Sequence, residues 1–146
     1  MRTDIFQGPE ECTCLAIRQA ARHVTQFYDQ QLAPFSLRTT QFSILAKLKR
    51  IGPMTINTLA DELVMDRTTL GRNILPLERE GLIGIAPGRE DRRSKELRLT
   101  EAGIERLQAA RLGWSEAQTR FAAAFGEQRA TGLRTLLGEV SATDLQ

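Results

Sequence analysis

The segment Asp66–Gly81 reads DRTTLGRNILPLEREG, and the segment Arg89–Thr100 reads REDRRSKELRLT. The first opens on a residue suited to cap a helix and closes on a glycine suited to the position after one. Two short β-prone runs, Leu82–Ala86 and Lys95–Leu99, flank a turn marked by proline and glycine. With a short helix predicted over Thr55–Leu63, the order is helix, tight turn, helix and a hairpin with an arginine-rich tip.

The helix predicted after Asp66 has two different sides. At about 100° per residue, Leu70, Ile74 and Leu77 share one narrow face that must be buried. The opposite face carries Thr68, Arg72 and Arg79, with Thr69 at its flank. Arginine pairs with guanine, and threonine can touch a phosphate or a thymine methyl. The face is therefore either a DNA-reading surface in a major groove or an ordinary solvated helix side.

The hairpin tip concentrates positive charge. Its cations are Arg89, Arg92, Arg93, Lys95 and Arg98, and its acids are Glu90, Asp91 and Glu96. We expect Asp91 and Arg93 to pair across the turn, which would hold one arginine in a fixed direction. Such a tip can reach phosphates or a narrow minor groove, and the alternative is a solvated, self-neutralised hairpin. Because this arginine-rich tip comes directly after the helix pair, the combination favours DNA binding.

The flanks are predicted to be long helices. One runs from Glu10 or Glu11 to about Ala33, and another from Arg38 to Arg50. After the hairpin, Thr100 caps a helix to about Phe125, and a last helix spans Glu127 to about Ser141. The predicted fold class is mainly α with a small β-hairpin (α+β), in one domain-sized chain of 146 residues.

Charge and composition narrow the class of protein. Residues 38–99 hold 12 Lys+Arg and 8 Asp+Glu, a balance of +4, and the flanks hold 8 and 10, a balance of −2. A basic centre between acidic flanks is typical of a DNA-reading core. No apolar run reaches the ~18 residues needed for a bilayer, and no leader-like pattern opens the chain, so we expect a cytoplasmic protein without a membrane partner. One His and two Cys cannot build a zinc site, and no phosphate loop or nucleophile motif is present, so we expect neither a metal, a cofactor nor an enzyme.

The same residues resemble a known family, the MarR family of bacterial winged helix-turn-helix regulators. The signature is Asp91-Arg92-Arg93 followed by Leu97, Leu99, Thr100 and Gly103, preceded by Asp66-Arg67-Thr68-Thr69 and by Leu77-Glu78-Arg79-Glu80-Gly81-Leu82-Ile83. Leu59-Ala60 in the Thr55–Leu63 stretch also matches. The resemblance is specific over roughly residues 38 to 103. Pro76 departs from the pattern and weakens the case for contacts beyond it, such as Arg79.

The resemblance implies a homodimer on a palindromic operator, with half-sites about one helical turn apart. It divides the chain into an N-terminal dimerisation helix (1–37), a winged helix-turn-helix module (38–100) and C-terminal dimerisation helices (101–146), intertwined in one domain. The implied DNA-binding residues are Arg67, Thr68, Thr69, Arg72, Arg79, Arg89, Arg92 and Arg93. In that set Arg93 enters the minor groove and Asp91 orients it.

The family's small-molecule effectors give the chain a second predicted site. Such regulators are often repressors released by small aromatic acids, phenols or related thioesters. Candidates to line a pocket are Arg18, Arg22, His23, Tyr28 and Phe42, although Phe42 suits the core and His23 suits the surface equally well.

Two alternatives to a ligand-released repressor stay open. Cys12 and Cys14 lie where some relatives sense oxidants, and the chain could be a thiol redox switch. Two residues apart on a helix they would point about 200° apart, which argues against a bridge between them. The other alternative is a protein-interaction module that no longer binds DNA, but the basic residues that such a module would lose are present.

Overall fold

The computed structural model describes residues 9–146, and residues 1–8 of the predicted N-terminal region lie outside the described residues. The elements in chain order are η1 (Pro9–Glu11), α1 (Thr13–Leu32), η2 (Ala33–Phe35), α2 (Thr39–Ile51), β1 (Met54–Thr55), α3 (Ile56–Leu63), α4 (Arg67–Arg79), β2 (Ile83–Pro87), β3 (Lys95–Leu99), α5 (Glu101–Phe125) and α6 (Glu127–Ala142). The predicted fold class, mainly α with a small β-hairpin, is confirmed.

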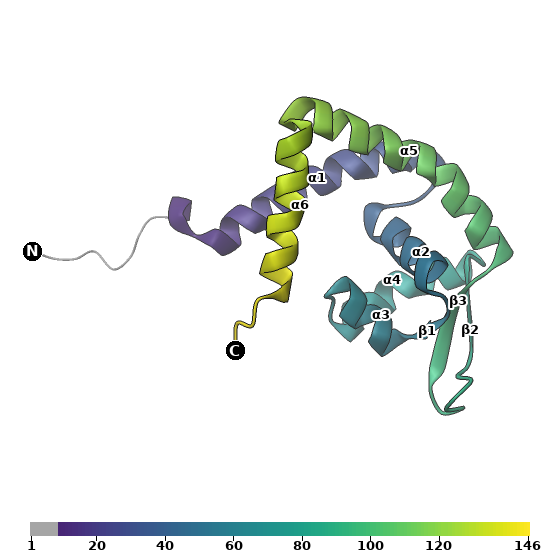
Figure 1. Cartoon of the computed structure of the whole chain (residues 1–146). Coiled ribbons are helices and arrows are strands. Elements are labelled where there is room, and N and C mark those ends of the chain that lie inside the picture. Colours follow the sequence, from purple (N-terminus) through teal and green to yellow (C-terminus); the bar gives the residue numbers. More distant parts are fainter. Residues whose placement is uncertain (1–8) are drawn as a thin grey trace, which may run out of the picture.

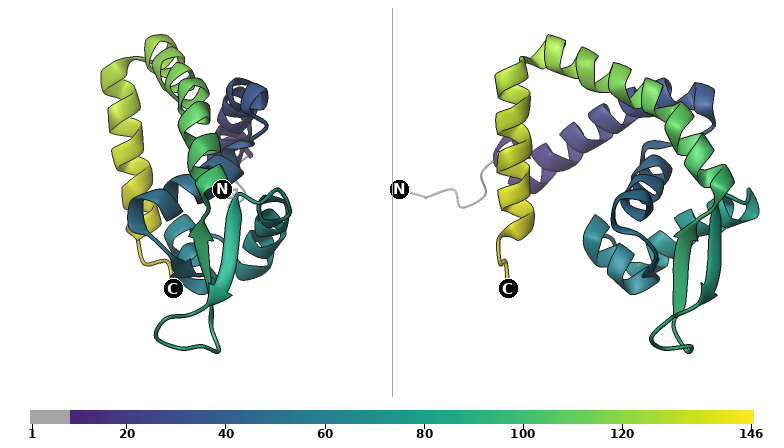
Figure 2. Two further views of the ribbon diagram at one scale, coloured as in Figure 1. Left: turned by 90° about the vertical axis from the view of Figure 1, so that its right-hand side faces the viewer. Right: turned by 45° about the vertical axis from the view of Figure 1, so that its right-hand side comes forward.

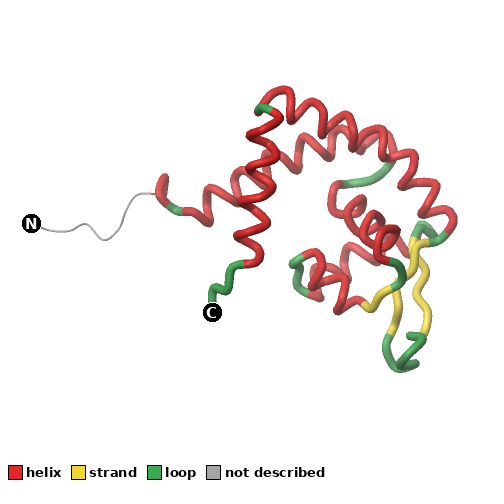
Figure 3. The backbone as a smooth tube through the Cα atoms, viewed as in Figure 1, coloured by secondary structure: helices red, strands yellow, loops and turns green. Residues whose placement is uncertain are grey.

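Two layers are visible in the ribbon. The long helices α1 and α5 pack against each other above a smaller module made of α2, α3, α4 and the strands (Figure 1). From the far end of α5, α6 turns back downwards and runs beside that module, separated from it (Figure 2). The β2–β3 hairpin extends beyond the helices of the module, and its tip is an open loop (Figure 3).

The core of the module is built by the predicted apolar stripes. Leu70, Ile74 and Leu77 of α4 are 0–2% exposed, which confirms the face assigned to burial. Leu59 from α3 and Leu97 from β3 pack in the same cluster. Burying side chains of this size contributes about 1.5–3 kcal/mol each, so α4 is held firmly by its inner face.

Three helix starts follow from local chemistry. The side chains of Thr55, Asp66 and Thr100 each accept a hydrogen bond from the backbone amide three residues later, which confirms the predicted N-caps. Gly81 has φ of +75° directly after α4, where a left-handed residue ends the helix.

Two expectations needed correction. The first helix starts at Thr13 and not at Glu10 or Glu11, because Pro9–Glu11 form a separate 3-10 turn. The hairpin is part of a three-stranded sheet in the order β1-β3-β2, since Met54 and Thr55 pair with Leu97 and Glu96. As the sequence predicted, Pro76 lies inside α4, which runs on to Arg79, and its missing N–H removes one hydrogen bond of that helix.

A close crossing holds the two long helices together, and hydrogen bonds at the end of α1 connect them to the module. A Cβ on Gly113 of α5 would lie 2.2 Å from the carbonyl oxygen of Gln31 in α1, so only glycine fits there. Five residues further along α5, Gln118 accepts a hydrogen bond from the Tyr28 hydroxyl of α1. At the end of α1, Asp29 accepts hydrogen bonds from the amide and hydroxyl of Thr39, both at 2.7 Å, at the start of α2. The position of the small module is thus tied to the long helices.

Candidate nucleic-acid interface

The outer face of α4, opposite its buried stripe, is open to solvent. Thr68, Arg72 and Arg79 are exposed there, as the spacing predicted, and Arg67 and Thr69 are also exposed. Within the described part of the chain, none of the three arginines lies within ion-pair distance of a carboxylate. Their guanidinium groups are available to an external anion.

The start of α4 is held by Asp66. Its carboxylate accepts from the Thr69 amide at 2.9 Å and from the Thr69 hydroxyl at 2.5 Å. These hydrogen bonds, with a smaller contribution from the charge of Arg72, hold the pKa of Asp66 below its usual value. The Thr69 hydroxyl therefore donates inside the protein and can still accept from outside. The first turn of α4 is fixed before any ligand arrives.

The hairpin tip, residues 88–94, is ordered by its own hydrogen bonds. The Gly88 amide donates to the Ser94 carbonyl at 2.8 Å, and the Ser94 amide and hydroxyl donate to the Asp91 carbonyl at 3.1 and 2.7 Å. A Cβ on Gly88 would lie 2.4 Å from the Ser94 hydroxyl oxygen, so glycine is needed at this point. Arg89, Arg92 and Arg93 are exposed around this frame.

The expected pair between Asp91 and Arg93 takes a different form. The Asp91 carboxylate accepts from the backbone amide of Arg93 at 2.9 Å and forms no ion pair with its guanidinium. The short side chain of Asp91 easily reaches the backbone amide two residues ahead. The long side chain of Arg93 would have to fold back over the loop to reach the Asp91 carboxylate. Asp91 thus shapes the loop, and the Arg93 side chain projects freely.

Glu96, expected from the sequence only as one of the acids that offset the charge of the hairpin, has a specific structural role in this site. It lies on the central strand β3, its side chain is only 15% exposed, and it accepts from the Arg89 amide at 3.2 Å. The Arg89 Nε atom lies 4.0 Å from the other carboxylate oxygen. A partly buried acid beneath the tip therefore anchors the loop segment that carries Arg89. In the sequence, Glu96 is one acidic residue among several cations and acids, and nothing there indicates its bond to the Arg89 amide.

Two exposed apolar residues flank the start and the middle of α4. Val64, in the turn between α3 and α4, is 76% exposed with φ of +52°. A β-branched residue is unfavourable in that left-handed conformation. Leu75 is 56% exposed on the outer side of α4. Neither had a role in the sequence-based prediction.

A large cavity lies between the long helices and the module. It has a volume of about 1200 Å³ and is lined by residues of α1, α2, α5 and α6 and by Leu63 at the end of α3. Its wall is mostly apolar and includes Tyr28 and the stacked rings of Phe42 and Trp114, whose centroids are 6.1 Å apart. Burial raises the pKa of Tyr28, and the charge of Arg134 partly opposes that rise.

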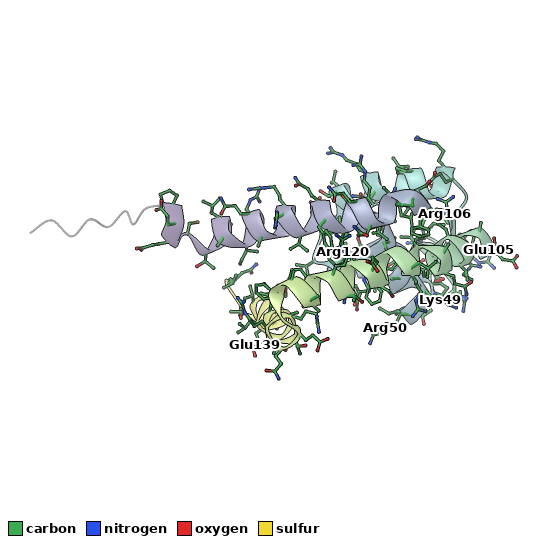
Figure 4. The ribbon with its side chains drawn as sticks, turned by 90° about the horizontal axis from the view of Figure 1, so that it is seen from above. Lys49, Arg50, Glu105, Arg106, Arg120 and Glu139 are labelled. Atoms are coloured by element: carbon green, nitrogen blue, oxygen red, sulfur yellow. The ribbon has the colours of Figure 1, made fainter. Side chains whose placement is uncertain are left out.

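The charged residues around this cavity are all cations. They are Lys47, Lys49, Arg50, Arg111 and Arg134. Lys49 and Arg50 lie next to each other near the end of α2 (Figure 4), and Lys47 pairs with Glu62 of α3 at 3.2 Å. Of the predicted pocket residues, the cavity brings together Tyr28 and Phe42. Arg18, Arg22 and His23 are exposed on α1 and do not line it.

Both cysteines are exposed at the start of α1. The Cys12 sulfur accepts from the Leu15 amide at 3.4 Å and acts as the N-cap, and Cys14 is the second residue of the helix. The two do not share a regular helical turn, contrary to the arrangement assumed from the sequence. No helix in residues 9–146 is both long and apolar enough to cross a membrane.

Comparison with known proteins identifies relatives of this fold and site. The MarR family model matches residues 37–95. The helix-turn-helix regulator YwoH of Bacillus subtilis is 38% identical over 85 residues, 58% of this chain and 61% of the relative. The regulator PecS of Dickeya dadantii is 30% identical over 115 residues, 77% of this chain and 69% of that protein. The chain thus spans under two thirds of YwoH and slightly more than two thirds of PecS.

A solved structure extends the similarity to nearly the whole chain. The Mycobacterium tuberculosis regulator MosR, in complex with DNA, superposes with a TM-score of 0.77 at 35% identity, covering 90% of this chain and 98% of that one. These relatives are transcriptional regulators and not enzymes.

Proposed function

Because the chain belongs to the MarR family of helix-turn-helix transcriptional regulators, we propose that it binds a palindromic DNA operator as a homodimer and represses transcription until a small ligand releases it. The observation that carries DNA binding is the pairing of two preformed cationic surfaces on one rigid module. One is the outer face of α4 and the other is the hairpin tip. Membership of a family of regulators agrees with the expectation that the chain is not an enzyme.

The outer face of α4 lies in the major groove in this proposal. Arg72 pairs with a guanine, and Thr68 and Thr69 contact nearby bases or phosphates. Arg67 and Arg79 contribute charge at the two ends of the helix. The hairpin tip follows the adjacent minor groove, where Arg93 enters, Arg89 and Arg92 bind phosphates and Asp91 keeps the loop in shape.

Selection of genomic fragments by the purified protein, followed by anisotropy over a salt series, tests this function. We expect a palindromic site bound about 10³-fold or more over random DNA, with a steep salt slope. Arg72→Ala should weaken specific binding by about 1–3 kcal/mol and relax base preference. Arg93→Ala should weaken binding most at sites with A·T-rich flanks. Equal, weak binding of every duplex would instead favour a protein-interaction role.

The dimer is supported by an uncovered apolar surface on the long helices. Leu136, Leu137 and Val140 of α6 are 42–61% exposed, and Ile17 of α1 is 37% exposed. Exposed apolar side chains grouped in this way on one helix are typical of a protein interface. A second copy would cover it and place two modules on one duplex. Sedimentation equilibrium should give twice the chain mass, and a monomer at micromolar concentration would contradict the dimer.

The proposed ligand site is the cavity lined by α1, α2, α5 and α6. An aromatic or apolar body fits beside Phe42 and Trp114, and the exclusively cationic charges favour an anionic group. A panel of aromatic carboxylates and phenols, with salicylate first, should raise the melting temperature and lower operator affinity. Trp114→Ala should abolish both effects, and ligand release that persists in this variant would place the effector elsewhere.

The exposed pair of cysteines supports a second, redox-based mode of release. A hydroperoxide would oxidise one thiolate to a sulfenic acid and leave as an alcohol, and the other thiol would then form a disulfide with loss of water. That bond would draw Cys12 away from the Leu15 amide and disturb the start of α1. Mass spectrometry after peroxide treatment should find a loss of two hydrogens, absent in Cys14→Ser. Unchanged operator affinity of the oxidised protein would exclude this mode.

A further inference from the structure

Leu75 is an exposed leucine on the side of α4 that carries the arginines. At about 100° per residue it is displaced by only about 20° around the axis from Thr68 and about 60° from Arg72. It lies far from the buried stripe of Leu70, Ile74 and Leu77, and it is 56% exposed where those three are 0–2% exposed. The outer face of α4 is therefore not uniformly polar.

No packing within the described residues accounts for this side chain. Leu75 is absent both from the core cluster with its partly buried neighbours and from the lining of the cavity. Its neighbour Pro76 continues the helix and offers no backbone donor. A leucine so placed gains from burial only when a partner covers it.

The chemistry of the proposed partner selects one contact. An α-helix lying in the major groove meets base edges that are almost entirely polar, and the exception is the C5-methyl group of thymine. The exposed Val64 is in the turn before α4, whereas Leu75 shares the face of Thr68 and Arg72. Leu75 is thus the apolar side chain of α4 best placed to meet such a methyl group.

We propose that Leu75 is a specificity-determining residue that packs against a thymine methyl group in each half-site. Along the axis it is about 4.5 Å from Arg72, from three residues at 1.5 Å each. Base pairs are about 3.4 Å apart, so the thymine lies within about two base pairs of the guanine paired with Arg72. The inference rests on the proposed placement of α4 in the major groove.

Replacing thymine with uracil in the selected operator tests the contact, because uracil lacks only the methyl group. Each thymine is replaced in turn, together with its symmetry mate. For the unaltered protein we expect one position where affinity drops about fourfold per half-site, roughly fifteenfold for both, the equivalent of one lost buried methyl at each. Leu75→Ala should bind the thymine and uracil duplexes equally at that position. The salt slope should be unchanged, because no phosphate contact is lost.

Two further variants separate this role from others. Leu112→Ala on α5 removes a comparably exposed leucine, 72% exposed, and should keep the full response to uracil. Leu75→Lys should steepen the salt slope and still not distinguish thymine from uracil. A uracil response in Leu75→Ala equal to that of the unaltered protein, or the absence of any response in the unaltered protein, would overturn the inference. An Arg72→Ala variant that loses affinity equally on operator and random DNA would instead refute the placement of α4.

Discussion

Replacing Gly113 with alanine should destabilise the protein at the crossing of α1 and α5. The added Cβ would lie 2.2 Å from the Gln31 carbonyl oxygen and 2.9 Å from a ring carbon of Phe35. Restoring an ordinary contact of 3.4 Å to that oxygen requires a displacement of 1.2 Å, from 3.4 − 2.2. The obstacle is a backbone atom, which no rotamer change can remove, so one of the two helices must move.

Two opposing terms set the size of this effect. Alanine is favoured over glycine in a helix interior by about 0.9 kcal/mol. Overpacking against backbone costs about 3 kcal/mol, near the upper end of the usual range. The net expectation is a loss of about 2 kcal/mol in the free energy of unfolding.

Gly71→Ala on α4 is the matched control, since a Cβ there meets nothing within 4 Å. It should stabilise the protein by about 0.9 kcal/mol from helix propensity alone. Urea denaturation followed by circular dichroism, at one protein concentration because the proposed dimer makes stability concentration-dependent, measures both variants. A Gly113→Ala protein as stable as the Gly71→Ala protein would show that α1 and α5 are not in backbone contact.

Three other perturbations probe the turn, the hairpin tip and the cavity. Val64→Gly should raise the free energy of unfolding by about 0.5–1 kcal/mol. This is the gain from removing a valine in a left-handed conformation, less the cost of the greater backbone entropy of glycine in the unfolded chain. Urea denaturation that shows no gain in stability would contradict the strain at Val64. Gly88→Ala should lower both the melting temperature and the operator affinity, the affinity about tenfold by anisotropy, because the new Cβ would lie 2.4 Å from the Ser94 hydroxyl oxygen and 2.5 Å from the Asp91 carbonyl oxygen and so forces the tip to change shape. Tyr28 is the single tyrosine, and burial raises the pKa of its phenol, so its ultraviolet titration midpoint should lie above 10 and rise further in Arg134→Ala. Because the Tyr28 phenol keeps its proton to a higher pH in the folded protein than in the unfolded chain, its contribution to stability is complete below pH 10 and is lost as the pH rises above that value. A titration midpoint at or below 10 would contradict the burial of Tyr28.

The helix pair could be predicted from the sequence because its signals are local. Thr55, Asp66 and Thr100 cap helices with amides only three residues away. The stripe of Leu70, Ile74 and Leu77 needs only the period of one helix to be recognised. Strand β1 could not be found in this way, since two residues carry no periodic pattern and Met54 becomes a strand only by pairing with Leu97.

The candidate site also contains features that could be predicted from local spacing and features that could not. The exposure of Arg72 and Arg79 follows from the helix period, because the opposite face must be buried. The link from Glu96 to the Arg89 amide, by contrast, depends on how the hairpin closes over its own strand. The direction of Asp91 towards an amide, and not towards a guanidinium, was likewise decided by the shape of the loop.

What the sequence determined by itself was the order of the long helices, the helix pair and the hairpin, the caps at Thr55, Asp66 and Thr100, the buried face of α4 and the concentration of charge at the hairpin tip. These features depend on contacts within a few residues, so the spacing of residues along the chain is enough to predict them. The tertiary structure alone decided which side of α1 faces the cavity, and so placed Tyr28 in the wall and left Arg18 outside. It also decided where α1 and α5 touch, at Gly113. The sequence of a helix such as α1 allows more than one of its faces to be buried, and the helices that pack against it decide which face that is.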